Sequence, residues 1–213
     1  MSSKTDSALK IAEFLLQIKA VKLEPAKPFT WASGWKSPIY CDNRKTLSFP
    51  KIRTFIRQEF VNVINEKFGK PDVIAGVATG GIAHAALVAQ EMGLPMIYVR
   101  SEAKTHGLTN MIEGVLEKGQ TVVVVEDLIS TGGSSLKVVS ALRDAGCKVS
   151  GMVSIFNYGF KISSDAFKKA KCELESLCNY ELLIQQAVKS NYVTEKDIAK
   201  LKAWRDNPSD WGK

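Results

Sequence analysis

The segment Thr121 to Ser135, TVVVVEDLISTGGSS, decides how the rest of the chain is arranged. Its run of four valines, Val122 to Val125, is long enough for a buried strand and too short for a helix of its own. Two carboxylates, Glu126 and Asp127, end the run, and we expect them to form an acidic turn. A small loop rich in hydroxyls and glycine follows at Ser130 to Ser135, and after it a segment with helical spacing. This order predicts an anion site, because loop N–H groups and a helix N-terminus favour a phosphate.

The two acids narrow the class of ligand. A site for phosphate alone has no use for carboxylates beside the anion, whereas a ligand with a phosphate, vicinal hydroxyls and a divalent cation does. The lysine of a GxxxxGK[ST] loop is missing, and so is a GxGxxG motif. The plain alternative is an ordinary strand-to-helix turn with incidental acids.

A second stretch repeats this design. Asp72 to Val77 predicts a strand, Ala78 to Gly81 a loop, and Ile82 to Met92 a helix. The T-G-G at 79–81 echoes the one at 131–133, which suggests two anion sites. We interpret His84, in the first turn of that helix, as a packing residue rather than a catalytic one.

Strands and helices alternate along the chain, with strands expected near residues 73, 96, 122 and 149. The alternation predicts an α/β fold with a mostly parallel central sheet flanked by helices. Ligands of such sheets bind outside the carboxyl ends of the strands, where both T-G-G loops fall. The length of 213 residues fits one domain, 1–213, with residues 1 to about 48 forming a small N-terminal hood. Further elements are expected as a strand over 173–178 and helices over 7–19 (with Ser7 as N-cap), 164–170, 180–189 and from a capping box at 194–197.

The segment Phe29 to Leu47 fits neither the helical nor the strand period. Trp31 and Trp35 lie there beside Lys36 and Arg44. Together these side chains suit a pocket for a flat anionic ligand, through stacking and charge. The equal alternative is that the tryptophans only pack a small subdomain.

Composition and charge exclude several classes of protein. The net charge of +7 is spread along the chain with no basic run among aromatics, so we expect no nucleic-acid partner. No run approaches the ~18 apolar residues of a membrane span, and the N-terminus does not resemble a secretory signal. Four cysteines without a CxxC pair, and two histidines, make a zinc site unexpected. We therefore expect a cytoplasmic protein with free thiols and no membrane partner.

The hydrophobic strand, paired acids and T-G-G loop resemble the signature of the type I phosphoribosyltransferases, whose earlier loop holds pyrophosphate. Five segments, in order, resemble the orotate phosphoribosyltransferase family in particular: FTWASGWKSPIYCDNR, IAGVATGGIAHA, MIYVRSEAKTHG, VVVVEDLISTGGS and VSIFNYGF. The resemblance covers nearly the whole chain. It implies transfer of ribose 5-phosphate from phosphoribosyl pyrophosphate to orotate, with Mg²⁺, giving orotidine 5′-monophosphate and pyrophosphate in de novo pyrimidine synthesis.

The resemblance also implies roles for individual residues. Glu126 and Asp127 would hold the ribose hydroxyls, directly or through water bound to Mg²⁺. Arg100, Lys104 and His106 would close on the pyrophosphate from a polar stretch that suits a lid, or that is an ordinary solvated loop. Lys104, His106 and Asp127 are the expected catalytic residues. The expected substrate-binding residues after the acids are Leu128, Ile129, Ser130, Thr131, Gly132, Gly133 and Ser134. In this family the closing loop comes from the partner subunit, which implies a homodimer with shared sites.

The sequence departs from one branch of the family at three positions. Ser101 and Ala32 replace lysines, and the strand at 149–156 is followed by Asn157, Tyr158 and Gly159 without an arginine that contacts orotate. The contacts to the orotate carboxylate are therefore open, and we hypothesise that Lys36 or Arg44 helps to bind it. Two other functions are alternatives: a phosphoribosyltransferase for another base such as a purine, and a regulator that senses phosphoribosyl pyrophosphate and binds nucleic acid.

Overall fold

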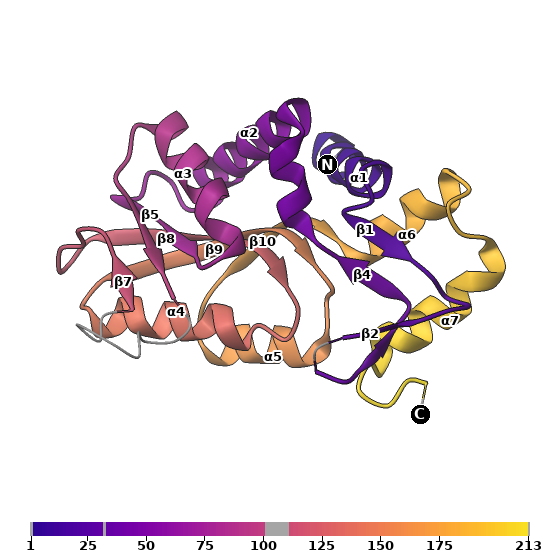
Figure 1. The fold of residues 1–213 in the computed structure, drawn as a ribbon. Coiled ribbons are helices and arrows are strands. Elements are labelled where there is room, and N and C mark those ends of the chain that lie inside the picture. Colours follow the sequence, from indigo (N-terminus) through magenta and orange to yellow (C-terminus); the bar gives the residue numbers. More distant parts are fainter. Residues whose placement is uncertain (1, 32, 101–110, 213) are drawn as a thin grey trace.

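A computed structural model describes residues 2–31, 33–100 and 111–212. At its centre is a six-stranded sheet in the order β10-β9-β8-β5-β6-β7 (Figure 1). Every neighbouring pair is parallel except β6 and β7. The strands are β5 (Val73–Val77), β6 (Met96–Val99), β7 (Ile112–Glu113), β8 (Thr121–Ile129), β9 (Lys148–Asn157) and β10 (Leu174–Asn179). The predicted α/β class with a mostly parallel sheet is confirmed.

Helices cover both faces of this sheet (Figure 1). On one side lie α1 (Ser2–Gln17), α2 (Pro50–Lys67) and α3 (Gly80–Met92). On the other lie α4 (Gly133–Asp144) and α5 (Lys161–Lys169). Two further helices, α6 (Tyr180–Lys189) and α7 (Glu195–Asp206), complete the chain beyond β10. No helix of the described ranges is long and apolar enough to cross a membrane.

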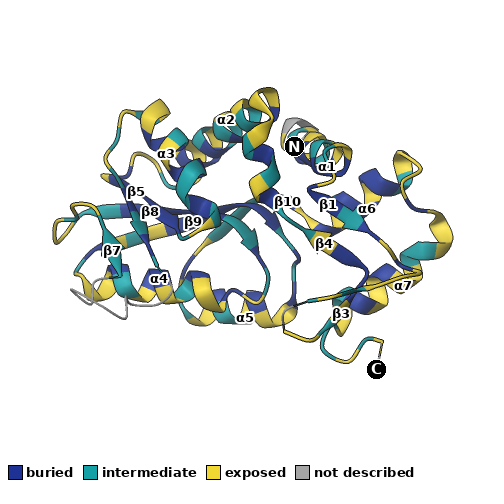
Figure 2. Cartoon of the chain, in the orientation of Figure 1, coloured by how far each residue is buried: buried dark blue, intermediate teal, exposed yellow. Residues whose placement is uncertain are grey.

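The valine run of β8 is buried on both faces of the sheet. Val123 and Val125 belong to the hydrophobic cluster that includes α1, α2 and α3, whereas Val122 and Val124 belong to the cluster that includes α4 and α5. All four side chains are fully buried, as the dark blue central strands in Figure 2 illustrate. Side chains alternate between the faces of a strand, so a sheet covered on both sides needs a continuous apolar run rather than an alternating one.

The N-terminal segment adds two small antiparallel pairs outside the main sheet. One joins β1 (Val21–Leu23) to β4 (Ile39–Cys41), and the other joins β2 (Phe29–Thr30) to β3 (Lys36–Ser37). The 3-10 helix η1 (Asn43–Ser48) then leads into α2. Helix α1, in contrast, shares the core of the main sheet with β10 and α6. A separate hood over residues 1–48 stays a prediction.

An aromatic cluster packs the N-terminal segment that carries Trp31 against the C-terminal helix α7. Trp31 packs edge-on against Trp204 with ring centroids 5.6 Å apart, and Tyr158 packs against both rings. Trp204 is fully buried, and its Nε1 donates a hydrogen bond to the carbonyl oxygen of Lys36 at 3.1 Å. Trp31 therefore packs in this cluster, and it also lines a pocket described below, so its role in binding a ligand stays a prediction.

The structure corrects three boundaries. The acids do not form a turn, because β8 continues to Ile129 and pairs with β9 as far as Ile129 and Asn157. Helix α1 begins at Ser2, so Ser7 lies within it and is not its N-cap. Helix α5 begins at Lys161, three residues earlier than predicted. The capping box of α7 is confirmed.

Candidate active site

The two predicted loops lie side by side at the carboxyl edge of the sheet. Strands β5 and β8 are parallel neighbours with Gly76 opposite Val125, so the loops that follow them meet at one edge. Helix α3 begins at Gly80 directly after the first loop, and α4 begins at Gly133 directly after the second. No described side chain caps either helix. The first N–H groups of both helices are therefore available to an anion.

The glycines of the first loop are required by close packing. A Cβ at Gly81 would collide with the carbonyl oxygen of Val125, and a Cβ at Gly80 would collide with the carboxylate of Asp127. In the second loop Gly132 has φ +81°, which an L side chain rarely adopts, and its neighbour on that side is Phe167. The T-G-G motifs thus let the first helix touch β8 and let the second loop turn tightly.

The two acids point to opposite faces of β8. Glu126 is buried, its Oε2 accepts a hydrogen bond from Ser135 Oγ in the first turn of α4 at 2.9 Å, and its Oε1 accepts one from the Asp127 N–H. The Asp127 carboxylate instead packs against Gly80 at the N-terminus of α3. The two carboxylates therefore contact the starts of different helices, because successive side chains of a strand alternate, and they also share a hydrogen bond with each other.

Both carboxyls resist ionisation in this setting. Burial raises the pKa of Glu126 well above its usual value, and the adjacent Asp127 charge raises it further. Burial also raises the pKa of Asp127, while the side-chain hydrogen bond with Glu126 and, to a smaller extent, the nearby Arg44 guanidinium oppose this shift. A cation or hydroxyl donors in the site would favour the charged form of both groups.

Several residues of this site were missed by the sequence analysis. Asn43 is fully buried, and its Nδ2 donates a hydrogen bond of 2.6 Å to the main-chain oxygen of Asp127. Ser135 holds Glu126, as described above. Tyr158 and Cys41 line a pocket beside Ser130. All of these residues lie in or beside the segments that carry the family resemblance, which is the one sequence signal for them. No spacing rule links Asn43 to Asp127, which lies 84 residues away.

That pocket, of about 260 Å³, joins the N-terminal segment to the second loop. Trp31, whose ring centroid lies 5.2 Å from that of Tyr158, forms part of an aromatic wall. Its full lining is Thr30, Trp31, Tyr40, Cys41, Leu128, Ser130 and Tyr158. Burial raises the pKa of the Tyr158 hydroxyl well above its usual value, so the group stays a neutral hydrogen-bonding partner. The pocket suits a flat, partly polar ring.

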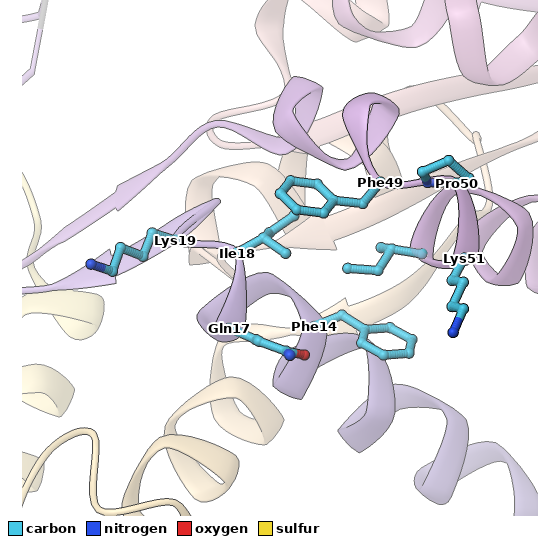
Figure 3. A pocket seen from close by; sticks show the side chains of 8 residues that line it. Phe14, Gln17, Ile18, Lys19, Phe49, Pro50 and Lys51 are labelled. Carbon is cyan, nitrogen blue, oxygen red and sulfur yellow. The ribbon is translucent and has the colours of Figure 1, made fainter.

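A larger apolar pocket, of about 800 Å³, lies elsewhere, between the end of α1 and the start of α2 (Figure 3). Phe14, Ile18 and Phe49 face its centre, while the amines of Lys19 and Lys51 point away from it. None of its lining residues is a predicted site residue. We place the site at the smaller pocket, because the loops and acids meet there.

The other predicted site residues fall at different depths. Leu128 and Ser130 line the small pocket, whereas the Ile129 side chain is fully buried in the core. Thr131 lies in the second loop, and Ser134 in the first turn of α4. Arg100 follows β6, and its Nη2 lies 3.5 Å from Glu113 Oε1. Lys104 and His106 lie outside the described residues.

The remaining candidates are His84, Lys36 and Arg44. His84 is 1% exposed, and burial together with the charge of Arg53 lowers its pKa to about 4, which supports a packing role. Lys36 Nζ donates to Thr30 Oγ1 of the pocket at 2.8 Å, and Arg44 pairs with Asp42 at 2.7 Å. Neither side chain lines the pocket itself.

No group of three or more His, Cys, Asp or Glu able to cage a metal exists in the described ranges. The two neighbouring carboxyls of Glu126 and Asp127 nevertheless offer oxygen ligands of the kind that Mg²⁺ takes together with water and phosphate oxygens. The chemistry of this donor set therefore fits Mg²⁺.

The paired loops, the strand acids and the sheet order define a phosphoribosyltransferase, and the model of the Phosphoribosyl transferase domain family matches residues 47–181. An orotate phosphoribosyltransferase of Phocaeicola vulgatus is 58% identical over 200 residues, covering 94% of each chain. One of Listeria innocua is 57% identical over 204 residues, covering 96% of this chain and 98% of that protein. The chain therefore belongs to the orotate phosphoribosyltransferase family.

Solved structures agree with this assignment. A UMP synthase of Leishmania donovani matches with a TM-score of 0.79 and 30% identity, over 93% of this chain and 42% of that one. An orotate phosphoribosyltransferase of Aeropyrum pernix matches with a TM-score of 0.71 and 26% identity, over 83% of this chain and 98% of that one. The fold and the family are thus supported by both sequence and structure.

Proposed function

We propose that this chain transfers the ribose 5-phosphate group from phosphoribosyl pyrophosphate to orotate, with Mg²⁺, releasing orotidine 5′-monophosphate and pyrophosphate in pyrimidine synthesis. The observation that carries the proposal is the position of Asp127. Its carboxylate packs on Gly80 of the first loop, while Ser130, three residues further along the chain, opens the aromatic pocket. A sugar held there would have an anion loop on each side and a base pocket adjoining.

The proposal distributes the donor over the two loops. The 5-phosphate binds at Ser130–Ser134 and the α4 N-terminus, and the pyrophosphate binds at 79–81 and the α3 N-terminus. Arg100, Lys104 and His106 close on the pyrophosphate. Glu126 and Asp127 hold the ribose hydroxyls and lie near the Mg²⁺, which neutralises charge on the pyrophosphate when bound.

The orotate ring occupies the pocket walled by Trp31, Tyr40 and Tyr158. A ring nitrogen of orotate forms a bond to C1 of the ribose as the bond from C1 to the pyrophosphate oxygen breaks. The electron pair of that bond leaves with the pyrophosphate, and the proton of the ring nitrogen passes to the departing pyrophosphate. No protein nucleophile is needed. Positive charge develops on the sugar, and negative charge grows on the leaving pyrophosphate. Arg100 and Lys104 stabilise that negative charge in a site from which water is excluded.

The chain acts as a homodimer in this proposal, with the segment that carries Lys104 supplied by the partner subunit. Mixing Lys104→Ala and Asp127→Asn homodimers tests this directly. If the site is shared, exchange of subunits yields mixed dimers with one intact site, and about a quarter of wild-type activity returns. No recovery after verified exchange would contradict the sharing. A cytoplasmic location is part of the same proposal.

The decisive experiment follows the loss of orotate absorbance with phosphoribosyl pyrophosphate and Mg²⁺. Wild type should consume orotate and no purine, and Asp127→Asn should lower kcat/KM by roughly 10- to 100-fold, as expected for a lost charged hydrogen bond. Asp165→Asn is the matched control, because Asp165 is exposed and its ion-pair partner among the described residues is Lys161, one turn earlier. Consumption of a purine instead of orotate would refute the acceptor assignment.

A further inference from the structure

A chain of buried hydrogen bonds links three elements that surround the proposed site. His84 Nε2 on α3 lies 3.3 Å from Thr46 Oγ1 on η1. Thr46 Oγ1 donates to the carbonyl oxygen of Asn43 at 2.6 Å, and Asn43 Nδ2 donates to the carbonyl oxygen of Asp127 at 2.6 Å. Asn43 and Thr46 are fully buried, and His84 is 1% exposed.

The number of protons on each group determines which group donates and which accepts in this series of hydrogen bonds. The Thr46 hydroxyl has one proton, and the shorter contact assigns it to Asn43. The hydroxyl must then accept from His84, so His84 carries its proton on Nε2. Asn43 uses its amide oxygen to accept from Cys41 Sγ at 3.2 Å, which fixes the orientation of its NH₂ group toward Asp127. Every group in the chain therefore has a defined role as donor or acceptor.

This series of hydrogen bonds is part of a closed ring of contacts that passes through the site. Asp127 is held by its main-chain oxygen through Asn43, and its carboxylate packs on Gly80. Gly80 lies one helical turn before His84 on α3, and His84 leads back through Thr46 to Asn43. Because this ring of contacts is closed, the distance between the start of α3 and Asp127 on β8 depends on each hydrogen bond of the ring.

We propose that Asn43 and Thr46 are positioning residues that set the distance between the first anion loop and the Asp127 carboxylate, acting through His84 and the Asp127 carbonyl. The inference rests on the proposed function, in which the donor sugar lies across this distance. It assigns a catalytic consequence to residues that do not line the pocket beside Ser130. His84 stays neutral above its lowered pKa of about 4, so the chain keeps one protonation state at physiological pH.

Thr46→Val tests this series of hydrogen bonds, because valine keeps the shape of threonine and removes the hydroxyl. We expect kcat/KM for phosphoribosyl pyrophosphate to fall about 10-fold, since a misplacement of about 1 Å can cost up to 100-fold. The KM for orotate should change less than twofold, because the pocket is lined by other residues. Thr46→Ser, which restores the hydroxyl, should recover most of the loss.

Ser154→Ala is the matched control. Ser154 is fully buried and shares a hydrogen bond of 2.8 Å with Ser176 on the neighbouring strand, outside the ring of contacts. Its loss should lower the melting temperature as Thr46→Val does and leave both KM values unchanged. Wild-type kinetics for Thr46→Val, or the same kinetic change in Ser154→Ala, would overturn the proposal.

Two readouts separate this proposal from the proposed function. Calorimetric titration with phosphoribosyl pyrophosphate and Mg²⁺, without any acceptor, should show weaker binding to Thr46→Val than to wild type. If wild type binds the donor but leaves orotate unchanged, the acceptor assignment fails, and the positioning role is judged on donor affinity alone. Nitrogen NMR should also show His84 protonated on Nε2 in wild type. Protonation on Nδ1 would overturn the assignment of donors and acceptors from His84 to Asn43.

Discussion

Replacing Gly80 by alanine should separate catalysis from stability. A Cβ at this position would lie 2.5 Å from Asp127 Oδ2 and closer still to Cγ and Oδ1. Ordinary contact begins at 3.4 Å, so the carboxylate must move by about 1 Å. The end of a side chain can yield at low cost, and alanine favours a helix over glycine, so the free energy of unfolding should hold or rise by about 0.4–1 kcal/mol.

The same displacement of about 1 Å should lower kcat/KM by up to 100-fold, because Asp127 would no longer meet the ribose hydroxyls in register. The adjacent Gly81→Ala is the comparison. There the obstacle is the carbonyl oxygen of Val125, which is backbone of the central strand and cannot yield. Gly81→Ala should therefore lose roughly 1–3 kcal/mol of unfolding free energy.

The assay combines orotate consumption with urea unfolding for both variants. Gly80→Ala should unfold like wild type and turn over slowly, whereas Gly81→Ala should unfold at lower urea. Wild-type kcat/KM in Gly80→Ala would show that the position of the Asp127 carboxylate does not matter to the reaction.

Three further predictions follow from the burial and contacts of single side chains. His84 is neutral in the folded protein, with a pKa of about 4 against 6.5 when unfolded. Its contribution to stability is therefore present above pH 6.5 and falls by roughly 3 kcal/mol on acidification to pH 4. Urea unfolding at each pH should show a steeper loss of stability for wild type than for His84→Gln, and an equal loss in both proteins would contradict this. Trp204→Ala should cost about 3–5 kcal/mol of unfolding free energy, because the ring is fully buried among aromatics; calorimetry measures it, and a loss below 1 kcal/mol would be incompatible with that packing. Lys36→Ala or Arg44→Ala should raise the KM for orotate if either side chain binds its carboxylate, and an unchanged KM in both would remove the hypothesis.

Local sequence was enough to predict the fold class and most of its elements. The valines of β8 must be covered on both faces, which requires helices on both sides of a parallel sheet. The capping box of α7 and the span of α6 were also correct, because capping and helical period are read within a few residues. Both T-G-G loops were located for the same reason.

Tertiary structure decided how those parts meet. Pairing with β9 extends β8 through the acids and so turns Glu126 toward α4 and Asp127 toward α3, which a sequence with two adjacent carboxylates does not reveal. The boundary of α1 was missed because polar residues before Ser7 continue the helix without an apolar signal.

The hydrogen bond from Asn43 to Asp127 joins residues 84 positions apart, and the pocket wall pairs Trp31 with Tyr158 across the fold. Hydrophobic period and glycine act locally, so they set which segments become strands, helices and anion loops. Only the folded chain decided which carboxylate faces which loop, since strand pairing and buried hydrogen bonds form between segments that are distant along the chain.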